Sequence, residues 1–179
     1  MLPVTKSASL LLLVLAVASL GACSLFEPQP TAPAKPAYTP PTYDLVASIR
    51  AAGAREKSVI DVNPLRDAGV ADLQDAAKAD EQAGHYADAA SKLDQALKLS
   101  PNSPDLMQDR AEIAVRMKDY PLAEKLAHQS WSLGPKLGPL CARNWQTVVE
   151  IRLQYNDQAG AETARKWVQQ CHKPGQPRY

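Results

Sequence analysis

The chain has 179 residues, enough for one folded domain of ordinary size. Its 20 Lys and Arg nearly balance its 19 Asp and Glu, and the net charge of +1 argues against a basic protein that captures nucleic acid or an anionic surface. Aromatic residues make up only 6%, with a single Phe, and alanine is frequent, which favours closely packed helices over sheets.

The first 22 residues have the pattern of an export signal. Lys6 is the only charged residue before an uncharged run over 7–22, and the centre of this run at 10–20 is almost wholly apolar. The run is shorter than the about 20 apolar residues that a membrane-spanning helix needs. A charged start, a short apolar middle and small residues at the end are typical of a secretory signal, so we expect residues 1–22 to be removed.

The signal ends at Leu20-Gly21-Ala22-Cys23, which resembles the lipobox of bacterial lipoproteins. The resemblance implies cleavage before Cys23, a diacylglycerol on its sulfur and acylation of the new amino group, and several acyl chains together anchor a protein stably. Ser24 stands where Asp commonly marks retention at the inner membrane in Gram-negative lipoproteins. This implies an anchor in the outer membrane, with the protein facing the periplasm. The alternative is an ordinary signal peptide, or a simple anchor, with an incidental cysteine.

The segment 23–42 is rich in proline. Six prolines lie between Glu27 and Thr42: Pro28, Pro30, Pro33, Pro36, Pro40 and Pro41. Such a segment cannot form a helix and favours polyproline II. We interpret it as a semi-rigid tether that holds the domain up to roughly 60 Å from the membrane. A docking ligand for an SH3-like groove is the alternative interpretation.

The segment 43–66 has a weaker pattern. Leu45, Val46, Ile49 and Ala52 have helical spacing, and Gly53 is a candidate end for this short helix. Residues 58–62 are rich in β-branched side chains and predict an extended stretch before a proline at 64. Two alternatives stay open for this segment, which either packs as a cap on the first repeat or stays flexible.

From about residue 70 onward the sequence repeats itself at 34 residues. The first set of matching positions is Ala77, Gly84, His85, Tyr86, Ala89, Leu93, Ala96 and Pro101, and the second is Ala111, Lys118, Asp119, Tyr120, Ala123, Ala127, Ser130 and Pro135. These positions resemble the signature of the tetratricopeptide repeat (TPR) family. The resemblance implies antiparallel helix pairs stacked into a short α-solenoid. The small residues let the paired helices approach closely, and the prolines stop each second helix.

The repeat pattern predicts helices over 69–83, 86–99, 103–117 and 120–133. Gly84 supplies the first turn, and Ser103 caps the third helix with Pro104 at its first position. A third, divergent unit follows the loop 134–139. Its first helix includes Trp145, Val148 and Val149, its turn Asn156 and Asp157, and its second helix Ala161, Ala164 and Val168.

The third unit departs from the repeat pattern at Gln158 and Arg165, as expected of a terminal cap whose outer face meets water. The fold class is therefore all-α, a TPR-like solenoid of about three helix pairs over 67–172, followed by a tail over 173–179.

Two cysteines remain after Cys23. Cys141 lies near the start of the third unit's first helix and Cys171 near the end of its second, and these ends are neighbours in an antiparallel hairpin. An exported compartment is oxidising, so the positions predict a disulfide. A metal site that includes His172 is the weaker alternative, because it offers only three ligands, two of them adjacent in sequence.

The sequence gives no pattern for catalysis. His85, His128 and His172 fall at unrelated repeat positions, so spacing places no base beside a nucleophile. There is no glycine-rich phosphate loop and no zinc motif. We therefore expect a non-enzyme without metal or cofactor other than the lipid on Cys23.

The TPR resemblance implies that the first helix of each repeat lines a concave groove for a protein or peptide. By repeat position, the groove side chains are Gln74, Lys78, Gln108, Glu112, Arg116, Gln146, Glu150 and Leu153. The alternatives are that these are only exposed helix residues, and that the protein is a structural or assembly component of the envelope without a specific peptide ligand. Trp131 and Trp167 lie on second helices and are interpreted as packing residues.

Overall fold

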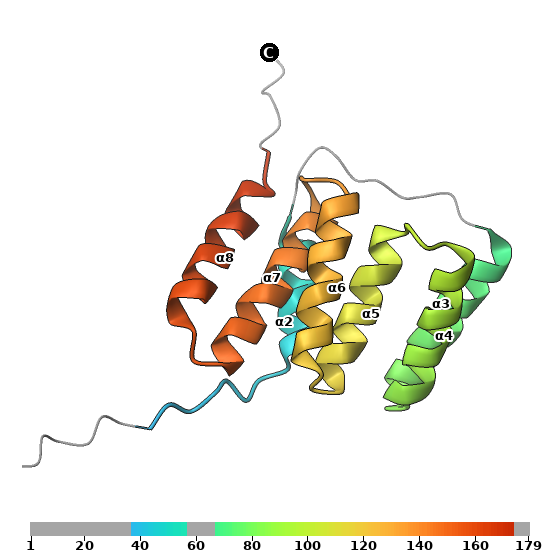
Figure 1. The fold of residues 1–179 in the computed structure, drawn as a ribbon, viewed down its shortest axis with the longest axis horizontal. Helices are drawn as coiled ribbons and strands as arrows, with labels where there is room; N and C mark the ends of the chain where they lie inside the picture. The colour runs from blue at the N-terminus through green and yellow to red at the C-terminus, as the bar shows by residue number, and fades with distance from the viewer. Residues whose placement is uncertain (1–36, 57–66, 174–179) are drawn as a thin grey trace, which may run out of the picture. The chain divides into compact units, whose positions relative to one another are not determined.

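The computed structural model describes residues 37–56 and 67–173. Within these ranges the chain forms α-helices and no strand, which confirms the all-α prediction. The helices are α2 (Leu45–Arg55), α3 (Ala68–Gln82), α4 (Tyr86–Leu99), α5 (Pro104–Arg116), α6 (Tyr120–Leu133), α7 (Pro139–Gln154) and α8 (Gln158–Gln170) (Figure 1).

The export signal, the lipobox with Cys23 and most of the proline-rich tether lie outside the described residues. Among the helices that are described, none is both long and apolar enough to cross a membrane. The compact unit that contains the seven described helices begins at Tyr38, so it includes part of the segment 43–66 that the sequence set apart from the repeat domain.

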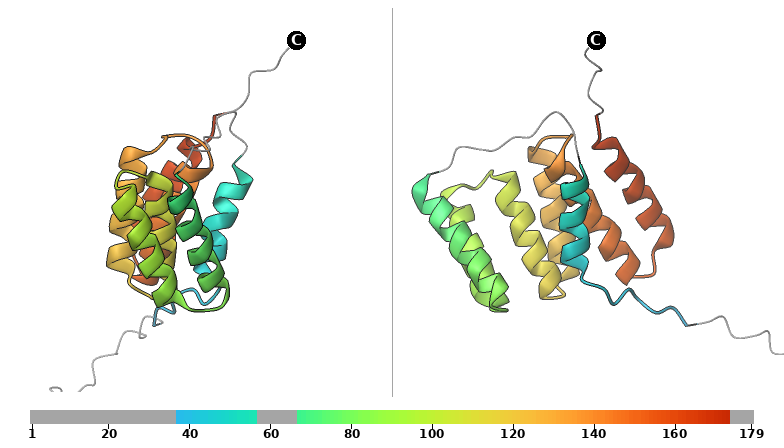
Figure 2. Two further views of the ribbon diagram at one scale, coloured as in Figure 1. Left: turned by 90° about the vertical axis from the view of Figure 1, so that its right-hand side faces the viewer. Right: turned by 180° about the vertical axis from the view of Figure 1, so that it is seen from behind.

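Three antiparallel hairpins make up the repeats: α3 with α4, α5 with α6, and α7 with α8 (Figures 1 and 2). Alanines lie at the contacts between paired helices, and Ala77, Ala89, Ala111 and Ala123 are all buried. Their small side chains allow close approach of the helix backbones, as the repeat pattern predicted. Two of the four helix ranges predicted from the repeats match the structure at both ends, and the other two differ by one residue at each end.

Each hairpin turns at a residue whose backbone has a positive φ, in the left-handed region. The residues are Gly84 with φ 81°, Lys118 with φ 61° and Asn156 with φ 60°, at equivalent positions of the three repeats. The prediction for Gly84 is confirmed, since glycine adopts this conformation without steric cost. Asp119 caps α6 as expected of an N-cap aspartate. Ser103 occupies the N-cap position of α5, but its hydroxyl bonds the Asp105 carboxylate instead of a helix N–H.

Helix α2 resolves the open question about the segment 43–66. It packs mainly on α7 and to a smaller extent on α5. The segment is therefore not a cap on the first repeat, and its helical part is packed against the domain. Val46 and Ile49 are fully buried in a cluster that includes Ala114 and Ile151. The view from behind in Figure 2 shows α2 on the face of the repeats opposite to the viewer's side in Figure 1.

The prediction that Gly53 ends this helix is wrong, because α2 continues to Arg55. Gly53 is instead buried at the contact between α2 and α7. A β-carbon at this position would lie 2.8 Å from Cγ of Arg143 and 3.1 Å from the carbonyl oxygen of Pro139. Glycine is therefore present because α2 approaches α7 closely.

Candidate functional site

The first helices of the repeats, α3, α5 and α7, carry glutamine at one shared position. Gln74, Gln108 and Gln146 are equivalent, and four residues further along each helix stand Lys78, Glu112 and Glu150. In the second and third repeats the glutamine donates a hydrogen bond to this glutamate, at 3.0 Å for Gln108 and 2.7 Å for Gln146. The repeats thus present a row of equivalent side chains on one face.

The structure corrects the expectation that this row is exposed. Gln108 and Glu112 have 0% of their surface exposed and Glu150 has 1%, because α2 lies over the second and third repeats. These three predicted groove residues are not accessible to a partner while α2 is in place. Of the other five, Lys78 is exposed, and Gln74, Arg116, Gln146 and Leu153 are partly buried.

Glu112 is the centre of an ion-pair network under α2. Its carboxylate accepts hydrogen bonds from Nε of Arg50 on α2 at 2.7 Å and from Nε of Arg143 on α7 at 2.8 Å. Arg143 also pairs with Asp109 at 2.7 Å. Burial disfavours the charged form of Arg143, but Glu112 and Asp109 outweigh this effect and hold its pKa above the ordinary value. The network joins α2, α5 and α7.

Glu150 forms a second polar centre at the N-terminal end of α2. It accepts hydrogen bonds from the hydroxyl of Tyr43 at 2.6 Å and from the hydroxyl of Ser48 at 2.5 Å. Burial and the adjacent carboxylate raise the pKa of Tyr43 to about 12. These contacts hold both α2 and Tyr43, the residue before its N-cap, against α7.

Ion pairs connect α2 to the first repeat at one end of α3. Glu81, near the C-terminus of α3, pairs with Arg50 at 2.7 Å and with Arg116 at 3.4 Å. Arg116 also donates to Asp44, the N-cap of α2, at 2.8 Å. Partial burial opposes ionisation of Asp44, but hydrogen bonds from the Ala47 N–H and from Arg116 outweigh it and lower the pKa of this carboxyl.

Between α2 and α3 the groove stays open as a cleft of about 510 Å³. Its floor contains Ala77, Leu93 and Ile113, which are themselves almost fully buried. The rim is charged and polar, and consists of Arg50, Gln74, Asp75, Lys78, Glu81, Asp109 and Arg143. We call this feature the open cleft.

The lining of the open cleft has the composition of a binding surface. Its lining includes no histidine, cysteine, serine or threonine, so it has no pair of nucleophile and base of the usual kind. In the part of the chain that the structure describes, no group of His, Cys, Asp and Glu is arranged to hold a metal ion. An apolar floor with a polar rim of both signs fits a segment of another protein.

Sequence reasoning missed several residues of this site. Arg50, Glu81, Asp109 and Arg143 line the open cleft or bind Glu112, yet none of them was among the predicted groove residues. One signal in the sequence could have indicated an ion pair between α2 and the groove. Arg50 lies in a segment with helical spacing, and Glu112 and Glu150 recur at one position of the later repeats. The charges are complementary, but the sequence did not show that they meet.

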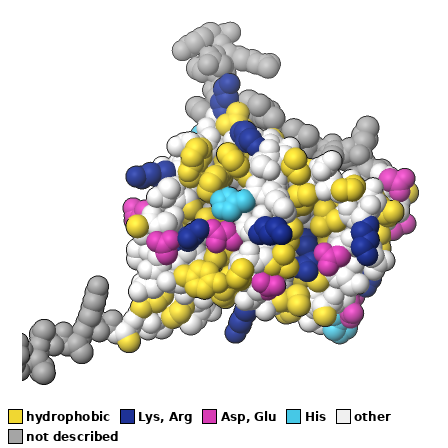
Figure 3. Space-filling model, in the orientation of Figure 1, with side chains coloured by type: hydrophobic (Ala, Val, Ile, Leu, Met, Phe, Trp, Pro, Cys, Tyr) yellow, Lys and Arg dark blue, Asp and Glu magenta, His cyan; other side chains and the backbone are white. Residues whose placement is uncertain are grey.

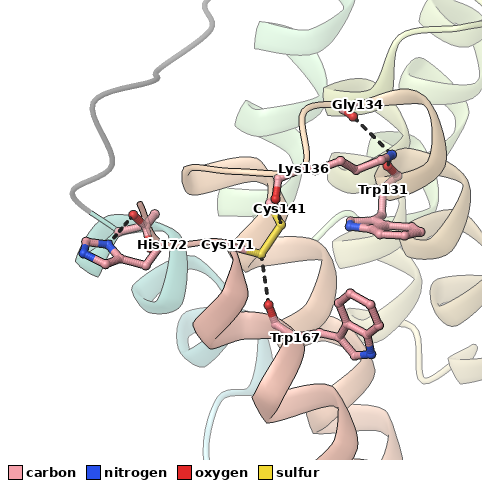
Figure 4. Close-up of a disulfide and its surroundings, with 8 residues drawn as sticks. Trp131, Gly134, Lys136, Cys141, Trp167, Cys171 and His172 are labelled. Atoms are coloured by element: carbon pink, nitrogen blue, oxygen red, sulfur yellow. Dashed lines mark hydrogen bonds and ion pairs between the residues drawn. A yellow bond between two sulfur atoms is a disulfide. The ribbon is translucent and has the colours of Figure 1, made fainter. Parts of the chain in front are cut away.

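The disulfide predicted between Cys141 and Cys171 is present, and its sulfurs join the start of α7 to the end of α8 (Figure 4). Both cysteines are buried and engaged with each other, which excludes them from the alternative metal site. His172 instead lies 2.9 Å from the Glu56 carboxylate, at the C-cap of α2.

A cluster of tryptophans lies beside the disulfide, where Figure 4 shows Trp131 and Trp167. The ring centres of Trp131 and Trp167 are 6.0 Å apart, and Trp145 stacks on Trp167 at 5.1 Å. Trp131 and Trp167 therefore pack on other rings, as interpreted from their positions on second helices, and Trp145 of α7 packs between the same two helices. Trp167 keeps 38% of its surface exposed.

The face shown in Figure 3 carries positive and negative side chains interspersed among hydrophobic ones. No single-sign region dominates this view, in agreement with the net charge of +1. Long-range attraction of a highly charged partner is therefore not a property of this face, and recognition has to depend on local contacts.

The sequence and the fold are similar to those of known helical repeat proteins. The sequence model described as Tetratricopeptide repeat matches residues 81–136, and the helix pairs form a TPR-like all-α fold. Among solved structures, the chain is similar to the globular C-terminal domain of P. aeruginosa LpoP. The two share 25% identity with a TM-score of 0.56, over 59% of this chain and 99% of that one. No curated protein matches the sequence.

Proposed function

We propose that this chain is a membrane-anchored TPR lipoprotein that binds a protein partner as an adaptor in the bacterial envelope. The observation that carries the proposal is the open cleft, a part of the concave groove that α2 leaves uncovered beside the first repeat. The similarity to a Tetratricopeptide repeat model over 81–136 supports a role in protein binding.

The lipobox supports the membrane anchor in this proposal. Cys23 would carry the lipid, Ser24 favours the outer membrane, and the proline-rich segment would hold the repeat domain away from the membrane in the periplasm. The Cys141–Cys171 disulfide is in keeping with an oxidising compartment. Globomycin should cause the unprocessed form to accumulate in cells, and unchanged processing would refute the anchor.

The likeness to LpoP supports the domain arrangement. That structure is described as a globular C-terminal domain, and the repeat unit of this chain likewise follows a long N-terminal segment. We propose that both chains present a helical repeat domain at the end of such a segment.

The test is photocrosslinking in living cells from defined positions on the domain. A photoreactive residue in place of Gln74, at the rim of the open cleft, should give a covalent adduct with one protein. The matched control is Gln95, which is exposed on α4 and does not line the cleft, and it should give no such adduct. Equal yields at the two positions, or none at Gln74, would contradict the proposal.

The burial of Gln108, Glu112 and Glu150 favours a second candidate, a structural or assembly component of the envelope without a peptide ligand. If the chain's own helix satisfies the groove, no partner is needed there. The same experiment separates the two functions, because a structural component predicts no specific adduct from Gln74.

A further inference from the structure

Helix α2 shows how this groove holds a helix. At the position shared by the second and third repeats, Glu112 and Glu150 face α2 and accept hydrogen bonds from Arg50 and Ser48. The apolar side of α2, with Val46 and Ile49, packs on the repeats beside these contacts. The groove therefore binds a helix by combining an apolar contact with an acidic side chain that meets a donor on the helix.

The first repeat has the opposite charge at this position. Lys78 is the equivalent of Glu112 and Glu150, and it lines the open cleft. Its side chain is exposed and makes no hydrogen bond or ion pair with any residue that the structure describes. The two arginines of the cleft differ from it, because Arg50 and Arg143 already pair with Glu112 and other carboxylates.

Asp75 also lines the open cleft, but it does not occupy the position that faces a bound helix. Its equivalent in the second repeat is Asp109, which pairs with Arg143 and accepts a hydrogen bond from Gln74 at 2.6 Å. These partners belong to the neighbouring repeats and not to α2. The charge that a helix would meet in the first repeat is therefore that of Lys78.

Resting on the proposed function, we infer that the open cleft receives a helical segment of the partner protein that presents a carboxylate to Lys78. The segment would lie in the groove as α2 does, with apolar side chains toward the floor at Leu93 and Ile113. This carboxylate would pair with Lys78 as Arg50 pairs with Glu112. Here the bound helix would carry the negative charge and the groove the positive one.

The same residue excludes α2 from the open cleft. If α2 moved over by one repeat, Arg50 would meet Lys78 instead of Glu112, and two like charges would face each other in a partly desolvated groove. Lys78 thus both selects an acidic partner and restricts the chain's own helix to the second and third repeats.

Two peptides test this inference on the purified protein. One has the sequence of residues 44–56, which includes α2, and the other is identical except for Arg50→Glu. Because peptides of this length are marginal helices in water, both carry the same staple between positions 47 and 54, which are exposed in α2. Fluorescence anisotropy gives each affinity, and a photoreactive group at Gln74 reports whether the peptide lies in the open cleft.

We expect the Arg50→Glu peptide to bind about fivefold or more tightly than the unchanged peptide. Lys78→Glu in the protein should reverse this order. Lys98→Glu is the matched control, because Lys98 is exposed on α4 outside the cleft, and it should leave the order unchanged.

Equal affinities for the two peptides, or an order that Lys78→Glu does not change, would overturn the inference. Failure of both peptides to bind would also overturn it, as would binding without a crosslink to Gln74, which would place the peptide outside the open cleft. These results would leave the proposed function intact if Gln74 still captures a protein in cells, so the two failures can be distinguished.

Discussion

At Gly53 the absence of a β-carbon allows α2 to lie against α7. Glycine inside a helix lowers the stability of the helix by about 1 kcal/mol relative to alanine. At an ordinary helix position, replacing glycine with alanine would therefore stabilise the protein. At Gly53 the nearest atoms to an added β-carbon belong to Arg143 and to the Pro139 backbone. The backbone atom cannot move as a flexible side chain does, and Arg143 is held by two carboxylates.

We therefore predict that Gly53→Ala lowers the free energy of unfolding, by about 1–3 kcal/mol, although alanine is the better helix former. Thermal and urea unfolding measure the change. Ala54→Gly, at an exposed position of the same helix, calibrates the intrinsic propensity. A more stable Gly53→Ala variant would contradict the close contact.

The buried carboxylate of Glu112 carries the second prediction at this scale. Glu112→Gln keeps the size of the side chain but leaves Arg50 and Arg143 without their shared carboxylate, and loss of one partner from a buried ion pair costs about 3 kcal/mol. The control is Glu124→Gln, which breaks a partly exposed pair with Arg152 and should cost less than about 1 kcal/mol. Similar urea midpoints for the two variants would show that Glu112 is not buried under α2.

Asp44 predicts a dependence on pH. Its pKa in the folded protein is lower than the ordinary 3.8, so its ionised form stabilises the fold above that pH, and this contribution is lost as the pH falls through the folded value. Asp44→Asn keeps a capping side chain but removes the charge that faces Arg116.

We expect Asp44→Asn to lower stability at pH 7 by less than about 1 kcal/mol, since the group is half exposed and screened by solvent. The difference from the unchanged protein should shrink as the pH falls below 3.8 and through the lower pKa of the folded chain, because protonation then removes the same charge from Asp44. Thermal unfolding at pH 7 and at a series of lower pH values checks this, and a difference that does not shrink in acid would exclude the charge of Asp44 as its source.

At the scale of elements, the last hairpin depends on a covalent link between its ends. The Cys141–Cys171 disulfide closes a separation of 30 residues, and closing such a loop stabilises a domain by about 3–4 kcal/mol in the chain-entropy model. Among the described helices, the hairpin of α7 and α8 has a neighbouring repeat on one side only, so we expect it to depend on this bond more than a hairpin between two repeats would.

Replacing both cysteines with alanine should lower the midpoint of thermal unfolding, and reductant should bring the unchanged protein towards the same midpoint. Tryptophan fluorescence reports the change locally, because the tryptophan cluster packs beside the disulfide. Reductant should not affect the double variant. Equal midpoints for the two proteins without reductant would show that the bond does not stabilise the fold.

The elements differ in how well the sequence predicts them, and the reason is the range of the contacts that define them. The hairpins follow from a pattern that recurs every 34 residues, with Gly84 and Lys118 in the turns and alanines at the helix contacts. Helix α2 is predicted by its apolar spacing, but its place on α7 depends on contacts between residues about 100 positions apart, such as Ser48 with Glu150.

For the molecule as a whole, the site in the structure differs from the predicted groove because α2 covers part of that groove. The predicted groove residues do share one face of the repeats, since repeat position determines the face of a helix. Their exposure could not be predicted, because a helix outside the repeats covers Gln108, Glu112 and Glu150. What stays open is the first repeat, where Gln74 and Lys78 line the cleft.

Helix α2 fills the groove over the second and third repeats and leaves the first repeat open. Hydrogen–deuterium exchange of the purified protein measures whether α2 is held there. We expect the amides of α2 (Leu45–Arg55) to exchange as slowly as those of α5 and α7, because the helix is packed into the domain. Rapid exchange throughout α2, with α5 and α7 protected, would show that the groove is free of α2 and would refute this arrangement.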